Sequence, residues 1–381
     1  MGYSEDYPFL CDGETVELIK KSKTLFFLRL PESENESLVT SIIKVYGNDD
    51  VLAIKPLSPD QKGESPPEAK KQCEDERGHY YQSLEKACKA GTKVVIIADP
   101  NLTRVNLEEY QRESLRSFYT TILVNPSDHE ERKKTPYPLF YGWFVNEENS
   151  RKLREIAEKI YEECLKNEKF SEEFTKSLIP DKKGQTPDPR KYFSSEDYEV
   201  GSIMLHCTAF YSNYGEVAGT EDYVSKEPVR KAIGKALRVQ VIGLLVTPQS
   251  LGFRLKLNQE DLTLWDEDDG ASVDPAEGGE SAAISRTLDD QCIITPMSPT
   301  CGTGSRAHFS VMSGPGVQPV QTGLDLVRLI EYEQKAAREK TGDEHLIIQL
   351  DCGKARCYGK GNWMVYFDKP REEEVLFSSF F

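Results

Sequence analysis

The stretches SIMLHCTAF, residues 202–210, and RAHFSVM, residues 306–312, set the interpretation of this chain. Both place a histidine two positions before a hydroxyl residue, within apolar surroundings that predict β-strands. The pairs are His206 with Thr208 and His308 with Ser310. Because side chains at i and i+2 of a strand point to one face, each strand should present an imidazole beside a hydroxyl.

Two such pairs suit the hydrolysis of a phosphodiester. One imidazole can take a proton from water while the other gives a proton to the departing oxygen, and histidine has both protonation states near neutrality. The hydroxyls can donate hydrogen bonds to the phosphate oxygens, and no metal is required. The alternative is two structural histidines bonded to nearby backbone. The other histidines, His79, His129 and His345, lack a matching frame and are expected to be surface or structural residues.

Further elements are predicted on both sides of the first frame. Residues 139–145 are typical of a strand, and Asn149 or Ser150 can cap the helix that follows. A second helix is expected from near Ser225 to Leu237. Its charged residues indicate either a solvated face or a rim that attracts phosphate; they are Arg230, Lys231, Lys235 and Arg238. Further strands are expected at residues 239–246, 253–257 and 262–265. Residues 266–281 are acidic and glycine-rich, which predicts a loop.

The first third of the chain reads as alternating strands and helices. Short continuous apolar runs are typical of parallel strands buried on both faces. They occupy residues 24–28, 93–97 and 121–124, and a helix is expected from Pro67 to Lys89. A polar segment at residues 125–135 reads as a linker. We therefore predict a doubly wound α/β domain over residues 1–133 and a second domain over residues 134–381.

Composition limits the setting and the substrate. The formal net charge of −16 disfavours long polyanions and weakly favours a small phosphate-bearing substrate. The nine cysteines show no paired spacing, so we expect no disulfide framework or zinc site and a reducing, cytoplasmic location. No apolar run is long enough to span a bilayer, and neither end carries a secretory signal, a myristoylation motif or a prenylation cysteine. We expect no membrane anchor in this chain and no cofactor.

Six short motifs in the second domain resemble one known family. They are PLFYGWF at 138–144, LHCT at 205–208, NYG at 213–215, GSRAH at 304–308, VQPVQTGLDL at 317–326 and GKGNWM at 359–364. In this order they resemble the 2′,3′-cyclic-nucleotide 3′-phosphodiesterase (CNPase) family of the 2H phosphoesterase superfamily. The first domain resembles that family's polynucleotide-kinase-like domain, so the resemblance spans the chain.

The resemblance implies a fold and an activity. The fold would be an α/β P-loop-like domain followed by an α+β 2H phosphoesterase domain, with two antiparallel-sheet lobes related by a pseudo-two-fold. The activity would convert nucleoside 2′,3′-cyclic phosphates, or RNA ends of that kind, to 2′-phosphates, and single-stranded RNA is a possible partner. The alternative is a non-catalytic protein that binds RNA ends or acts as a scaffold. The prenylated tail of the family is absent from this sequence.

The resemblance also implies site residues. His206, Thr208 and His308 match catalytic positions, and Ser310 stands where the family usually has threonine. We assign His308 as base and His206 as acid, although the sequence leaves the reverse order open. Tyr211 replaces a phenylalanine that stacks on the base. Arg306, Pro319, Val320 and Gln321 match the wall of the substrate pocket. A surface salt bridge for Arg306 and a simple turn at Pro319 are the alternatives.

The phosphate loop of the first domain departs from the family. Its expected pattern is GxxxxGK[ST], whereas residues 30–37 read LPESENES. Glu32 and Glu34 replace glycines, and Asn35 replaces the lysine that neutralises phosphate. Glu36 replaces the hydroxyl residue that would hold magnesium. The sequence therefore predicts a degenerate domain without kinase activity, which argues against a third reading, an active polynucleotide kinase.

Overall fold

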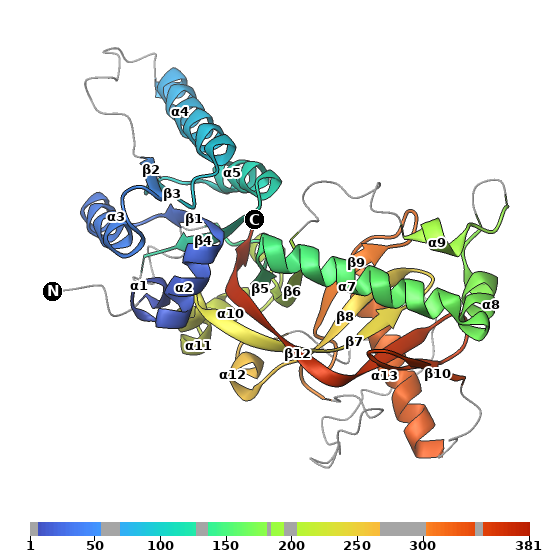
Figure 1. Cartoon of the computed structure of the whole chain (residues 1–381). Coiled ribbons are helices and arrows are strands. Elements are labelled where there is room, and N and C mark those ends of the chain that lie inside the picture. Colours follow the sequence, from blue (N-terminus) through green and yellow to red (C-terminus); the bar gives the residue numbers. More distant parts are fainter. Residues whose placement is uncertain are drawn as a thin grey trace.

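The structure, a computed structural model, contains two β-sheets that follow each other along the chain (Figure 1). It describes residues 7–54, 69–126, 136–180, 184–193, 204–266, 302–339 and 346–381. Five of the sequence expectations lie wholly or mostly outside these ranges: His129, His345, the boundary between residues 133 and 134, the predicted linker beyond residue 126, and all but the first residue of the predicted loop at 266–281.

The first sheet is parallel, as the apolar runs predict. Its strand order is β2-β3-β1-β4. The strands are β1 (Lys23–Leu28), β2 (Val51–Ile54), β3 (Val94–Ala98) and β4 (Tyr119–Val124). The helices of this part are α1 (Pro8–Cys11), α2 (Gly13–Lys21), α3 (Glu32–Tyr46), α4 (Ala69–Ala90) and α5 (Arg104–Arg116).

Helices cover both faces of this sheet because its strands are buried on both sides. In β1, Phe26 and Leu28 belong to a cluster with residues of α1, α2 and α3. Leu25 and Phe27, which alternate with them, belong to a second cluster with residues of α4 and α5. This arrangement confirms the parallel α/β character expected of the first domain.

The turn between β1 and α3 satisfies its own hydrogen-bonding groups. Asn35 is buried, its Oδ1 accepts from the Leu30 amide at 3.2 Å, and its Nδ2 donates to the Leu30 carbonyl at 2.9 Å. The amides of Glu34 and Asn35 both donate to the Pro31 carbonyl at 2.9 Å. Glu32 and Glu34 place acidic groups in the first turn of α3. A phosphate-binding loop needs free amides and positive charge at this position, whereas three amides of this turn are engaged and its first helical turn is acidic.

The second sheet is antiparallel and nearly closed into a barrel. Its strands follow the order β6-β5-β12-β7-β8-β9, with β11 and then β10 on the other half of β12. The strands are β5 (Phe140–Val145), β6 (His206–Tyr211), β7 (Ala236–Val246), β8 (Ser250–Lys256), β9 (His308–Ser313), β10 (Ile347–Leu350), β11 (Gly353–Cys357) and β12 (Trp363–Phe380). Each histidine strand is thus one strand away from the central β7–β12 pair.

Helices and turns surround this sheet. They are α7 (Glu147–Lys166), α8 (Glu168–Ser177), α9 (Pro189–Tyr192), a 3₁₀ helix (Asn213–Gly215), α10 (Thr220–Ser225), α11 (Glu227–Ala232), α12 (Gln259–Leu262) and α13 (Gln321–Glu339). The expected helix after residue 145 is present, but the side chain of Asn146 caps it by accepting from the Asn149 amide at 2.9 Å. Asn149 and Ser150 therefore lie inside α7.

Two other expectations are wrong. The helix expected to reach Leu237 ends at Ala232, and β7 begins at Ala236. Gly234 adopts a φ of +75°, which suits glycine and ends the helix. The strand expected at residues 262–265 is the end of α12 and a turn, because Asn258 and Asp261 form a capping box that starts a helix.

The end of β12 packs against the first sheet. Ser378 Oγ donates to the Thr121 carbonyl, and the Phe381 amide donates to Gln111 Oε1. The Phe381 side chain is buried in the cluster formed by β1, β3, α4 and α5. Figure 1 accordingly places the chain end marked C beside β4 and α5. These contacts join residues more than two hundred positions apart and tie the two sheets together.

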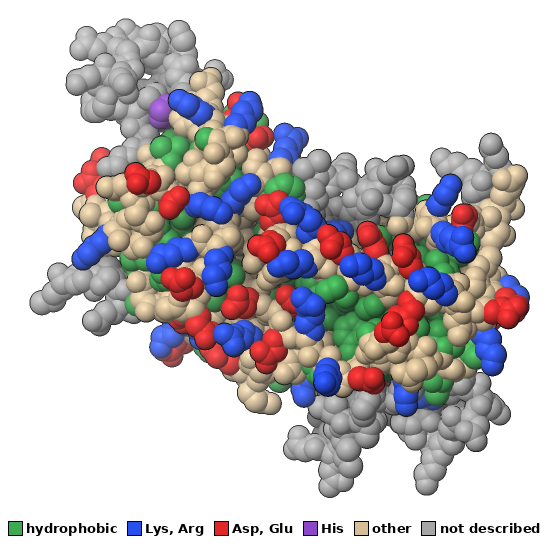
Figure 2. Space-filling view, viewed as in Figure 1, with side chains coloured by type: hydrophobic (Ala, Val, Ile, Leu, Met, Phe, Trp, Pro, Cys, Tyr) green, Lys and Arg blue, Asp and Glu red, His purple; other side chains and the backbone are tan. Residues whose placement is uncertain are grey.

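Opposite charges are interspersed on the surface. Figure 2 shows Lys and Arg next to Asp and Glu over the visible face. On α7, Arg151 pairs with Glu147 at 2.7 Å. Three of the four basic residues of the predicted helix are also paired: Lys231 with Glu227, Lys235 with Glu260, and Arg238 with Glu14. These pairs favour the solvated face. Within the described ranges, no helix is long and apolar enough to cross a bilayer.

The turn between β1 and α3 generates a prediction about nucleotide binding. Because the amides of Leu30, Glu34 and Asn35 are engaged and the first turn of α3 is acidic, the protein should not bind Mg-ATP as a P-loop kinase does. A calorimetric titration should show no binding up to millimolar concentrations. Micromolar affinity that is lost on changing Asn35 or Ser37 would contradict this prediction.

Candidate active site

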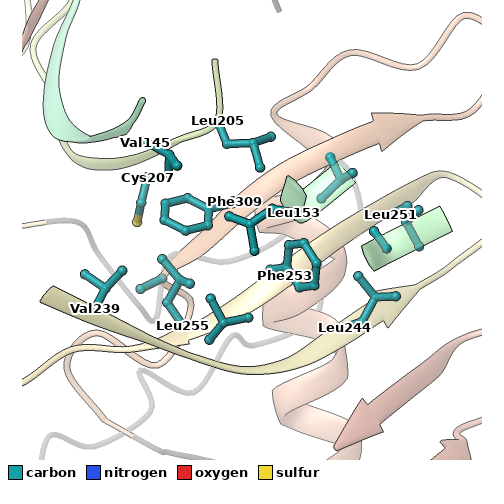
Figure 3. Packing of buried hydrophobic residues seen from close by; sticks show 14 of the residues in the cluster. Val145, Leu153, Leu205, Cys207, Val239, Leu244, Leu251, Phe253, Leu255 and Phe309 are labelled. Atoms are coloured by element: carbon teal, nitrogen blue, oxygen red, sulfur yellow. The ribbon is translucent and has the colours of Figure 1, made fainter. Parts of the chain in front are cut away.

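The two histidine strands meet through their apolar side chains. Cys207 and Phe309 are buried in one cluster with Val145, Leu205 and Phe253 (Figure 3). β6 and β9 lie side by side, although β6 is hydrogen-bonded to β5 and β9 to β8. Since side chains alternate along a strand, the residues on either side of Cys207 and Phe309 face away from this core. Both histidine–hydroxyl pairs therefore lie on the face opposite the core.

The two strands have the same local register. Thr208 lies opposite Gly142 of β5, and Ser310 lies opposite Gly252 of β8. Each pairing shifts by one residue directly after the hydroxyl position, so that one extra residue, Ala209 or Val311, forms a bulge. The two histidine motifs, residues 206–208 and 308–310, are thus similar in their pairing with the neighbouring strands as well as in sequence.

The His308 imidazole is oriented by its own strand. Its Nδ1 lies 2.8 Å from the Arg306 carbonyl oxygen. A carbonyl can only accept, so Nδ1 carries the proton and Nε2 of the neutral ring has a free lone pair. Burial lowers the pKa of His308 to about 4, and the charges of Arg306 and His206 contribute to the decrease. The ring is therefore neutral near pH 7 and able to accept a proton.

The His206 imidazole has a matching environment. A hydrogen bond to the backbone of Met204, two residues earlier, favours the charged ring, but burial lowers its pKa below the usual value. The ring stacks on Phe140 with centroids 4.9 Å apart and on Phe144 at 5.8 Å. Phe380 of β12 stacks on Phe140 in turn, at 4.9 Å. An aromatic wall from β5 and β12 therefore supports this histidine.

The structure brings most of the predicted site residues to this face. Thr208 and Ser310 are half-buried, and Ser310 Oγ donates to the Pro319 carbonyl at 3.2 Å. The charge of Arg306 acts on His308. Gln321 begins α13, and its Nε2 donates to Asp325 Oδ1 at 2.7 Å.

Two predicted residues are largely exposed. Tyr211 ends β6 with 45% of its surface exposed, and its hydroxyl donates to Asn213 Oδ1 at 3.2 Å. Val320 precedes α13 and is 70% exposed. His79 lies on α4 beside Tyr80, outside this group of residues. Among the residues that the structure describes, no cluster of three or more His, Cys, Asp or Glu could hold a metal ion.

Sequence reasoning missed the residues that support the histidines. The stacking of Phe140 and Phe144 on His206 follows from the alternation in PLFYGWF, which places both on one face of β5. Gly323 lies against His308, with an added Cβ only 3.0 Å from Cε1. Its position in the motif VQPVQTGLDL was visible, but the contact depends on how α13 packs.

Comparison with known proteins identifies the family. Residues 137–381 match the sequence profile of the family described as 2′,3′-cyclic nucleotide 3′-phosphodiesterase (CNP or CNPase). The chain is 28% identical to the rat 2′,3′-cyclic-nucleotide 3′-phosphodiesterase over 405 residues, which cover 98% of this chain and 87% of the relative. The proteins of that name from Mus musculus and Pongo abelii are each 27% identical, with the same coverage. This chain belongs to the 2′,3′-cyclic nucleotide 3′-phosphodiesterase family.

Proposed function

We propose that the protein hydrolyses nucleoside 2′,3′-cyclic phosphates, or RNA ends that carry them, to 2′-phosphates without a metal. The observation that carries this proposal is the pair of imidazoles on neighbouring strands, each with a hydroxyl two residues away on one face of the sheet. The family membership supports the same reaction. The residue roles below are part of the proposal.

His308 acts as the base in this account. Its Nε2 takes a proton from water as the water oxygen attacks phosphorus. The bond from phosphorus to the 3′ oxygen breaks, and protonated His206 gives its proton to that oxygen. The large decrease in the pKa of His308 supports this order, because a base must be neutral at the start of the reaction. Thr208 and Ser310 donate hydrogen bonds to the non-bridging oxygens as their charge increases.

The surrounding residues define the proposed substrate pocket. The guanidinium of Arg306 balances the phosphate charge, and the exposed ring of Tyr211 offers a face on which a base can stack. Pro319, Val320 and Gln321 form the opposite wall, where α13 begins. The same surface can hold the end of a single-stranded RNA. A protein that binds such ends without turnover is the alternative, and a turnover assay with 2′,3′-cyclic AMP separates the two.

We also infer a pseudo-two-fold relation between the two halves of the second sheet. Both halves run from a histidine strand through one partner strand to the central β7–β12 pair. Both halves also have a glycine opposite the hydroxyl residue and a bulge directly after that hydroxyl residue. We further propose a reducing, cytoplasmic setting, which the scattered spacing of the nine cysteines favours.

His206→Ala and His308→Ala should each lower turnover of 2′,3′-cyclic AMP by roughly 10²–10⁴, the usual contribution of a positioned proton-transfer group. His79→Ala is the matched control, because His79 lies on α4 in the first domain. Steady-state kinetics on the purified variants tests this prediction. A near-normal rate in either catalytic variant would sink the assignment.

Ser310→Ala should slow turnover roughly ten- to a hundredfold, because one charge-assisted hydrogen bond of about 1.5–3 kcal/mol is lost in the transition state. Ser310→Thr should turn over nearly as fast as the parent, since it keeps the hydroxyl. The ratio of kcat/KM between the two variants is the measurement. Equal rates for Ser310→Ala and the parent would reduce Ser310 to a strand residue.

The rate should be bell-shaped in pH. The value of kcat/KM should rise as His308 loses its proton at a pKa of about 4 and fall as His206 loses its own, at a pKa below the usual 6.5. A bound phosphate anion favours both imidazolium forms, so the limbs of kcat should lie at higher pH than those of kcat/KM. EDTA should have no effect. Loss of activity in EDTA that zinc restores would indicate a metal mechanism instead.

A further inference from the structure

The first turn of α13 lies against His308 of β9 and against Gly252 of β8. A Cβ added at Gly323 would lie 3.0 Å from Cε1 and 3.6 Å from Nε2 of His308. The buried Thr322 packs into the space left by Gly252, where an added Cβ would lie 2.3 Å from the threonine methyl. Gly252 is the residue opposite Ser310. The position of this turn therefore determines how much space is available around His308 and Ser310.

One buried carboxylate fixes the start of the helix. Asp325 is 6% exposed, and its Oδ2 accepts from Thr247 Oγ1 at 2.6 Å and from Ser250 Oγ at 2.7 Å. Its Oδ1 accepts from Gln321 Nε2 at 2.7 Å. Thr247 Oγ1 accepts in turn from the amides of Gln249 and Ser250. Asp325 thus joins the first turn of α13 to the β7–β8 turn, from which the partner strand of β9 starts.

A buried ion pair holds the same helix two turns later. Arg254 Nη1 lies 3.0 Å and 2.9 Å from the two carboxylate oxygens of Glu333, and both side chains are at most 1% exposed. Tyr366 of β12 donates to the same carboxylate. Arg254 is the residue opposite His308 in the β8–β9 pairing. Asp325 and Glu333 are eight positions apart, about 12 Å along the helix, so α13 is held to β8 at two separate points.

We propose that Asp325 is a positioning residue that holds the first turn of α13 against the His308 imidazole and thereby fixes the direction of its Nε2. The inference rests on the proposed role of His308. Oδ2 receives two hydroxyl donors and Oδ1 an amide donor, so an asparagine, which has one acceptor oxygen, would have to face a donor with its own NH₂ group. A misplacement of about 1 Å in a reacting group costs up to roughly a hundredfold in rate.

The test compares Asp325→Asn with Glu331→Gln, a control that makes the same carboxylate-to-amide change on the exposed side of α13. Asp325→Asn should lower kcat for 2′,3′-cyclic AMP by roughly ten- to a hundredfold and change KM less. NMR titration of isotope-labelled histidine should show the pKa of His308 shifted towards its usual value, because a looser turn admits water to a ring whose pKa is lowered by burial. An unchanged kcat and an unchanged titration of His308 would overturn the proposal.

Gly323→Ala tests the same contact without removing a buried charge. Alanine is favoured over glycine within a helix, so the melting temperature should not fall. Its methyl group would lie 3.0 Å from His308 Cε1, so kcat should fall about tenfold and the His308 signals should move. Parent-like kcat and signals would overturn the proposal even if Asp325→Asn did not fold. If the parent protein does not turn over cyclic phosphate, the proposed function fails, while the His308 titration still tests the positioning claim.

Discussion

The proposed site depends on one packing arrangement: Cys207 of β6 and Phe309 of β9 are buried in the same hydrophobic core. β6 and β9 are each hydrogen-bonded to another strand within the described sheet, so their mutual approach rests on side-chain packing across the gap. Because side chains alternate along a strand, the histidines and hydroxyls must then lie on the opposite face. The central β7–β12 pair supports both halves at once, since its long strands bind β8 on one side and β5 on the other. The core and the candidate site are two faces of the same strands.

Burial shapes the chemistry as well as the fold. It lowers the pKa of both imidazoles, which favours their neutral forms and suits His308 to the proposed role of base. The proposed reaction also needs one protonated imidazole, and the negative charge of a bound phosphate favours that form. Arg306 acts in the opposite sense, because its charge lowers the pKa of His308 while it can attract the substrate. Substrate binding and proton placement are therefore linked in this account.

Local pattern predicted much of the architecture. The apolar runs around Phe26, Ile96 and Ile122 became parallel strands, and the two histidine frames became strands of one sheet. The errors arose where a single residue changed the local structure, as Gly234 does at the end of α11 and Asn258 at the start of α12. The contacts that hold the site in place could not be predicted from local sequence patterns. Asp325 bonds Thr247 across 78 residues of sequence, and Glu333 bonds Arg254 across 79. The packing of Phe381 into the first domain is of the same kind.

The central claim is that water adds to the phosphorus of a 2′,3′-cyclic phosphate and that the bond to the 3′ oxygen breaks. Phosphorus NMR of the reaction of 2′,3′-cyclic AMP in heavy-oxygen water tests it most directly. The account predicts one product, the 2′-phosphate, with one solvent oxygen in its phosphate group. A 3′-phosphate as the main product, or no conversion by the intact protein, would contradict it.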